Sequence, residues 1–143
     1  MNTPANPSDL TPTSEDIEGI TQASRDYVES WYAADGERMR GCLHPDLVKR
    51  TLMRDPQQGT WQLRRPSDAQ MMVAFTQEGG GSHMPESERT YQITILDAFR
   101  HIATVKVLSH PYMDYLHIAK INDRWLIVNV LWEVRQGELG PDF

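Results

Sequence analysis

Three polar side chains that could do chemistry lie close together in a segment predicted to be a β-strand, residues 112–121. Asp114 occupies an even position, whereas Tyr115 and His117 occupy odd ones. Because side chains alternate along a strand, Asp114 faces one side of the sheet, and Tyr115 and His117 face the other. In an apolar cavity, Asp114 would have a raised pKa, which suits proton abstraction near neutral pH. The opposite face would offer a phenol and an imidazole, and a polar contact between subunits is the third interpretation.

His44 is a second candidate for acid–base chemistry. It follows a predicted short helix and precedes Pro45. An imidazole with an ordinary pKa of about 6.5 can act as a base or as a hydrogen-bond donor. His44-Pro45-Asp46 is more typical of a helix stop, whose imidazole binds a nearby backbone carbonyl. Asp114, His44 and His117 are therefore the catalytic candidates.

Aromatic side chains form the candidate ligand-binding set. Tyr27 and Trp31 share one face of a predicted first helix, and Trp61 lies on a predicted short strand. Aromatic residues at helical spacing usually belong to the core, but here they could also form a flat apolar wall with a hydroxyl or an indole donor. Together with Tyr115 they are the residues expected to contact a ligand.

Metal, nucleotide and thiol chemistry find little support in the sequence. The five histidines include no His-x-His pair on a strand and no His-Glu-x-x-His motif, and Cys42 is the single cysteine. The glycines at 79–81 follow a helix instead of leading from a strand into one, so the geometry that cradles a phosphate is missing. We expect no metal and no cofactor.

Composition narrows the class of protein further. The 143 residues carry 14 basic and 20 acidic side chains, a net charge of -6, which argues against a nucleic-acid binder. No apolar run reaches the length of a membrane span, and a lone cysteine excludes an internal disulfide framework. We expect a cytoplasmic protein with neither a nucleic-acid nor a membrane partner.

The elements that must position these side chains form one domain, predicted over residues 13–136. Residues 1–12 contain three prolines and read as a disordered tail, and residues 137–143 as a second tail. Thr13 and Asp16 are a capping pair for a helix that runs to about Ala34. A second short helix ends before His44-Pro45. A third helix is predicted to begin with a capping box of Ser67 and Gln70. The predicted strands cover residues 47–54, 60–64, 91–96, 102–108, 112–121 and 125–134.

The last predicted strand is apolar on both faces. Strict alternation places Trp125, Ile127 and Leu131 on one face, and Leu126, Val128, Val130 and Trp132 on the other. A strand of this kind in an antiparallel sheet needs cover on both sides. Helices can cover one face, and a second subunit is the economical cover for the other. The order of helices and strands predicts an α+β fold in which a cone-shaped, curved antiparallel sheet wraps around the N-terminal helix.

Two stretches carry a resemblance to a known family. They are Ser-Trp-Tyr-Ala-Ala-Asp-Gly at 30–36 with Leu-His-Pro-Asp-Leu at 43–47, and the strand pair that spans 112–132. Residues 14–134 resemble the nuclear transport factor two-like (SnoaL-like) superfamily, and within it the bacterial group labelled putative lumazine-binding. The resemblance implies a cone, a homodimer through the outer face of the sheet, and a pocket between the concave face and the helices. It assigns no catalytic residue to this chain.

These observations predict a small-molecule-binding, homodimeric protein with a largely apolar pocket. Two alternatives stay open. One is a cofactor-free isomerase, dehydratase or cyclase that uses a pocket Asp or His, and the other is a dimerisation module without a ligand.

Overall fold

The first helix, α2 (Ser14–Ala33), begins at the predicted cap. The Thr13 hydroxyl accepts a hydrogen bond from the Asp16 backbone N–H at 3.1 Å, and the Asp16 carboxylate accepts one from Thr13 N–H at 3.3 Å. The helix ends at Ala34, close to the predicted end, and Ala34 has a left-handed conformation. This computed structural model describes residues 11–135. The predicted tails at 1–12 and 137–143 therefore lie outside the described residues, apart from Thr11 and Pro12.

The middle of the chain departs from the predicted boundaries. Helix α3 (Gly36–Cys42) passes directly into β1 (Leu43–Arg54), which starts four residues before the predicted strand. Strand β2 (Trp61–Ser67) is longer than predicted and takes in Ser67. The cap of α4 (Ala69–Gln77) is consequently Asp68, whose carboxylate accepts from Met71 N–H at 2.8 Å. The prediction of Ser67 as the cap was wrong, because its backbone belongs to the strand.

The last third of the chain forms four strands in series, as predicted. After a short 3-10 turn, η1 (Glu86–Glu88), come β3 (Tyr91–Phe99), β4 (Ile102–Ser109), β5 (Tyr112–Ile121) and β6 (Arg124–Val134). Asn122 and Asp123 connect β5 to β6 with positive φ at both residues, which is the geometry of a tight hairpin turn.

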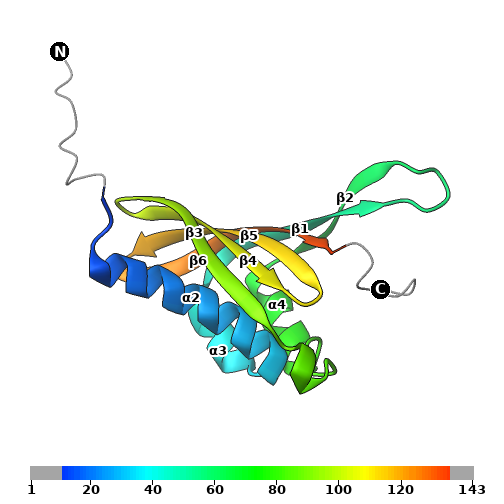
Figure 1. Ribbon diagram of the computed structural model, residues 1–143, viewed down its shortest axis with the longest axis horizontal. Coiled ribbons are helices and arrows are strands. Elements are labelled where there is room, and N and C mark those ends of the chain that lie inside the picture. The colour runs from blue at the N-terminus through cyan, green and yellow to red at the C-terminus, as the bar shows by residue number, and fades with distance from the viewer. Residues whose placement is uncertain (1–10, 136–143) are drawn as a thin grey trace, which may run out of the picture.

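All six strands belong to one sheet, in the order β2-β1-β6-β5-β4-β3. Every neighbouring pair is antiparallel except β1 and β6, which run parallel. Figure 1 shows α2, α3 and α4 on the same side of the curved sheet, and the β1–β2 hairpin extending away from the body. The fold is the expected α+β cone, with one parallel pairing that the sequence analysis did not predict.

A bulge in β6 changes which side chains face the helices. His117 pairs with Asn129, but its neighbour Ile118 pairs with Ile127, so Val128 is an extra residue in β6. An extra residue shifts the alternation by one. Ile127 therefore lies on the same side as Val130, and the predicted strict alternation along β6 was wrong beyond the bulge.

The core lies between α2 and the concave side of the sheet. Ile20, Leu116, Ile118, Ile127 and Val105 are fully buried there. No helix within residues 11–135 is long and apolar enough to cross a membrane.

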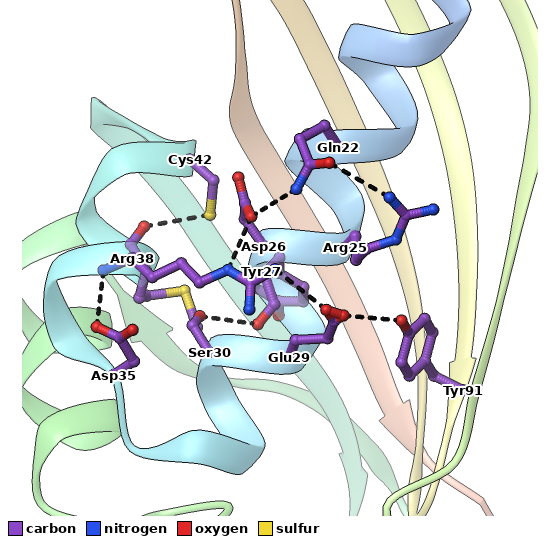
Figure 2. A network of polar contacts seen from close by, with 11 residues as sticks. Gln22, Arg25, Asp26, Tyr27, Glu29, Ser30, Asp35, Arg38, Cys42 and Tyr91 are labelled. Carbon is purple, nitrogen blue, oxygen red and sulfur yellow. Dashed lines mark hydrogen bonds and ion pairs between the residues drawn. The ribbon is translucent and has the colours of Figure 1, made fainter.

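Ion pairs outside the core fix α2 against its neighbours (Figure 2). Arg38 of α3 donates to Asp26 at 2.8 Å and to Glu29 at 3.1 Å, both on α2. Glu29 also accepts a hydrogen bond from the Tyr91 hydroxyl of β3 at 3.0 Å. These contacts tie α2 to α3 and to the edge of the sheet on either side of Tyr27, the α2 residue at the centre of the candidate site.

Candidate functional site

A cavity of about 690 Å³ opens between α2, α4 and the concave side of the sheet. Its wall is mostly apolar and includes Val28, Trp31, Met72, Phe75, Val107 and Trp132. A cavity of this size suits a small organic molecule, and an apolar wall with a few polar groups is typical of ligand sites.

Three polar side chains form a continuous hydrogen-bonded line on the cavity wall. The Lys49 ammonium donates to the Tyr27 hydroxyl at 2.6 Å, and the Tyr27 hydroxyl donates to Asp114 Oδ2 at 2.7 Å. Tyr27 and Asp114 are each only 5% exposed. The Tyr27 hydroxyl binds Oδ2 of Asp114, and the Asp114 side chain itself lines the cavity.

Each member of this line comes from a different element. Tyr27 lies on the α2 face that packs on the sheet, and Asp114 lies on β5 between strands β4 and β6. Lys49 lies on β1 between the buried Leu47 and Thr51, so its side chain points to the same side as theirs. The strand alternation and the helical face together bring the three groups to one point.

The electrostatics of the line follow from burial. Burial raises the pKa of Asp114 above its ordinary value, and the hydrogen bond from Tyr27 and the charge of Lys49 oppose that rise only in part. Burial likewise lowers the pKa of Lys49, while the nearby Asp114 opposes the decrease. The pKa of Tyr27 is raised well above 10 by burial and by Asp114. Tyr27 is therefore a neutral phenol, and both charged neighbours are pushed toward their neutral forms.

Aromatic rings surround the Lys49 nitrogen. It lies 5.0 Å from the Tyr27 ring centre, 5.9 Å from that of Trp31 and 5.7 Å from that of Trp132. Such distances allow cation–π attraction. Trp31 is itself held by the loop after α4, because a Cβ at Gly80 would run into its indole.

Comparisons with known proteins identify the family and the fold of the chain. A family profile described as putative lumazine-binding matches residues 15–133. The chain belongs to this family. No curated protein matches the chain.

Solved structures of the same fold include several bacterial proteins. An NTF2-like protein of unknown function from Silicibacter pomeroyi DSS-3 is 16% identical, with a TM-score of 0.65 over 87% of this chain and all of its own. One from Methylobacillus flagellatus KT is 19% identical, with a TM-score of 0.61 over 88% of this chain and 97% of its own. A protein with a cystatin-like fold from Nostoc punctiforme PCC 73102 is 13% identical, with a TM-score of 0.60 over 94% and 100%. At these identities the likeness concerns the fold alone.

The structure divides the predicted site residues between two faces. Asp114, Tyr27 and Trp31 meet at the cavity. Tyr115 is 45% exposed on the outer face of β5, and His117 lies beside Asn129 on that same face, with 3.3 Å between their side-chain nitrogens. Of the two faces left open by the sequence, the one that carries Asp114 lines the cavity.

Two further predicted residues lie away from the cavity. His44 is the second residue of β1, and its Nδ1 accepts a hydrogen bond from Asp46 N–H at 3.0 Å. The ring therefore binds a backbone N–H and not the predicted backbone carbonyl. Trp61 is 56% exposed on the β1–β2 hairpin.

Lys49 was not among the predicted site residues. One signal pointed to it: Leu47, Lys49 and Thr51 are alternate residues, so their side chains face the same side of a strand. A lysine that shares its side with a large apolar residue such as Leu47 can face the covered side. The weak alternation of residues 47–54 hid this signal. Among residues 11–135, no group of three or more metal-ligating side chains comes together.

Proposed function

We propose that this protein binds a small, planar and largely apolar organic molecule in the cavity beneath α2 and α4. The observation that carries the proposal is the line from Lys49 through Tyr27 to Asp114 on an otherwise apolar wall. Buried polar groups without enough partners are costly, so a site that keeps them is suited to a ligand with complementary groups.

The polar line also limits the chemistry of the ligand. Lys49 can donate a hydrogen bond, and Asp114 Oδ1 can accept one. A lactam edge, a ring carbonyl next to a ring N–H, presents the matching acceptor and donor side by side. The aromatic rings of Trp31 and Trp132 suit a flat heterocycle. A planar heterocycle with a lactam edge is therefore the ligand class that we propose, and the family's lumazine-binding description supports it.

Calorimetry and thermal unfolding with lumazine test this proposal, with acetophenone as a planar ligand that lacks a lactam. At a hundredfold excess over the dissociation constant, lumazine should raise the free energy of unfolding by about 2.7 kcal/mol. Lys49→Met should weaken binding ~10- to 100-fold, because a hydrogen bond from a charged group is lost. Lys106→Met, the same change on the outer face of β4, should leave binding unaltered. Equal effects of the two substitutions, or no stabilisation by any planar heterocycle, would contradict the proposal.

Proton transfer is a second candidate function, favoured by the burial of Asp114 and by its place on the cavity wall. A carboxylate with a raised pKa can take a proton from the carbon next to a ketone. In deuterated water, the protein should then exchange the methyl protons of acetophenone, and Asp114→Asn should abolish the exchange while Lys49→Arg retains it. Exchange that survives Asp114→Asn would exclude Asp114 as the base.

We also propose that two copies of the chain pair through the outer face of the sheet. Neighbouring strands expose apolar side chains there, namely Val48, Leu52, Leu63, Tyr115 and Leu131. A second copy of the same face would bury them, whereas no helix of the described chain lies on that side. In sedimentation experiments Leu131→Asp should shift the protein toward monomer, and Leu96→Asp, an equally exposed position on edge strand β3, should not. The same oligomeric mass in solution for the two variants would contradict the proposal.

A further inference from the structure

Lys49 differs from the other lysines of the chain in its surroundings. The three lysines of the chain are Lys49, Lys106 and Lys120. Lys120 forms an ion pair with Asp16 at 3.0 Å, and Lys106 lies on the outer face of β4. Lys49 is the one that lines the cavity, and the Tyr27 phenol is its hydrogen-bond partner at 2.6 Å.

The hydrogen bonds of the line all point the same way. Lys49 N–H points to the Tyr27 oxygen, and Tyr27 O–H points to Asp114 Oδ2. If the Lys49 proton moves to Tyr27 while the Tyr27 proton moves to Asp114, the result is a neutral amine, an unchanged phenol and a carboxylic acid. The exchange removes two charges at once, that of buried Asp114 and that of half-buried Lys49. Burial drives the pKa values of Lys49 and Asp114 in the two directions that this exchange requires.

We propose that Lys49 is a nucleophilic amine that captures aldehydes in the cavity as an imine. The proposal rests on the ligand site described under Proposed function, and adds aromatic aldehydes as a class of reactant. A lysine desolvated in an apolar pocket is a known type of activated nucleophile.

The reaction balances with the groups present. The Lys49 nitrogen attacks the carbonyl carbon, the C–N bond forms, and the carbonyl oxygen takes up the proton held by Asp114. A second proton passes from nitrogen to that oxygen, the C–O bond breaks, and water leaves. The products are an iminium cation on Lys49, an Asp114 carboxylate and one water molecule.

The cavity wall favours this product. The iminium carries a positive charge at the position where three aromatic rings, of Tyr27, Trp31 and Trp132, lie 5.0 to 5.9 Å from the nitrogen. Asp114 becomes the counter-ion. An aromatic aldehyde also matches the apolar surface contributed by Phe75 and Val107.

Reductive trapping tests the inference on the full-length protein. Benzaldehyde and sodium cyanoborohydride convert an imine to a stable benzyl amine, which peptide mass spectrometry locates. Lys49 should carry at least ~10-fold more benzyl than Lys106 or Lys120, since each unit by which a pKa falls raises the neutral-amine fraction about tenfold. Lumazine should protect Lys49 and leave the other two lysines unchanged.

Two variants separate the effect of the proton relay, the exchange from Lys49 through Tyr27 to Asp114, from the effect of access to the cavity. Lys49→Arg should leave no cavity label. Tyr27→Phe should slow labelling of Lys49 ~10-fold or more, the effect of one pKa unit, because the ammonium loses its route to Asp114. The matched control Tyr115→Phe, on the outer face of β5, should label like the parent protein.

The outcomes distinguish this inference from the function that it builds on. Labelling of Lys49 at or below the level of Lys106 would overturn the inference, and stabilisation by lumazine in the same sample would leave the proposed ligand site standing. Selective trapping without stabilisation by lumazine would support the imine and reject the lactam ligand. Labelling in Tyr27→Phe at the parent rate would overturn the relay.

Discussion

The two faces of strand β5 differ more than their sequence suggests. On the concave face, Asp114 and Leu116 are 5% and 0% exposed, and Asp114 has a hydrogen-bonded partner on α2. On the outer face, Tyr115 is 45% exposed, and His117 has a weak contact with Asn129. Each face of the strand carries one polar and one aromatic or aliphatic side chain that could lie on either face. Cover by the helices, and not residue type, therefore decides that Asp114 is buried and has a shifted pKa.

The largest contrast is expected between neighbouring truncations on β5. Leu116→Ala should lower the free energy of unfolding by about 2 to 5 kcal/mol, because it opens a hole in a fully buried site. Tyr115→Ala should change it by no more than about 0.5 kcal/mol in the monomer. Urea unfolding, at concentrations where sedimentation shows monomers, measures both. Similar losses would mean that the two faces are equally packed.

Removal of a single tyrosine hydroxyl should have the next largest effect on the free energy of unfolding. Tyr27→Phe should lower the free energy of unfolding by about 1 to 3 kcal/mol, because buried Asp114 and half-buried Lys49 lose the partner that they share. Tyr115→Phe should have no measurable effect. Urea unfolding again gives the comparison, and a Tyr27→Phe variant as stable as the parent would show that the line contributes nothing to the fold.

The contributions of Asp114 and Asp16 to the free energy of unfolding should change in opposite directions as the pH falls. Ion pairing with Lys120 and the Thr13 hydroxyl lower the pKa of Asp16 from 3.8 to about 2. Asp16 therefore stabilises the fold above pH 3.8, and this contribution disappears as the pH falls through about 2. Asp16→Asn should be destabilised near neutral pH, and should lose that deficit in acid.

Asp114 should behave in the reverse way. Its folded-state pKa is raised by burial, so ionisation opposes folding as the pH climbs above the ordinary value of 3.8. Asp114→Asn should gain stability relative to the parent as the pH rises. Urea unfolding between about pH 2 and pH 6 gives both profiles, and slopes of the same sign would contradict the assignment of the two environments.

The smallest effects are expected at the two histidines. His117→Ala and His44→Ala should each change the free energy of unfolding by about 0.5 kcal/mol or less, and neither should alter lumazine affinity. Calorimetric titration checks the second point. A loss of binding in His117→Ala would place the site on the outer face of the sheet, and a loss in His44→Ala would place it near the start of β1.

Much of the fold could be predicted because it rests on local signals. The capping pair of Thr13 and Asp16, the aromatic face of the first helix and the Asn122-Asp123 turn all act within a few residues. The bulge at Val128 and the parallel pairing of β1 with β6 depend on contacts between distant segments, and local patterns carry no information on them.

The candidate site was likewise predicted in part, because some of its features are local and others depend on tertiary packing. Strand alternation separated Asp114 from Tyr115, but the face that the helices cover is a tertiary property. Lys49 escaped notice because lysine is usually an exposed residue, and only its packing under Tyr27 and Trp31 makes it unusual.

The most direct test follows the four indole N–H resonances of the ¹⁵N-labelled protein during titration with lumazine. Trp31 and Trp132 line the cavity, while Trp61 is exposed on the β1–β2 hairpin and Trp125 packs against Gly19 of α2. Saturable shifts should occur at Trp31 and Trp132, with Trp61 unmoved. Shifts at Trp61 with Trp31 and Trp132 unchanged would contradict a ligand site on the concave face.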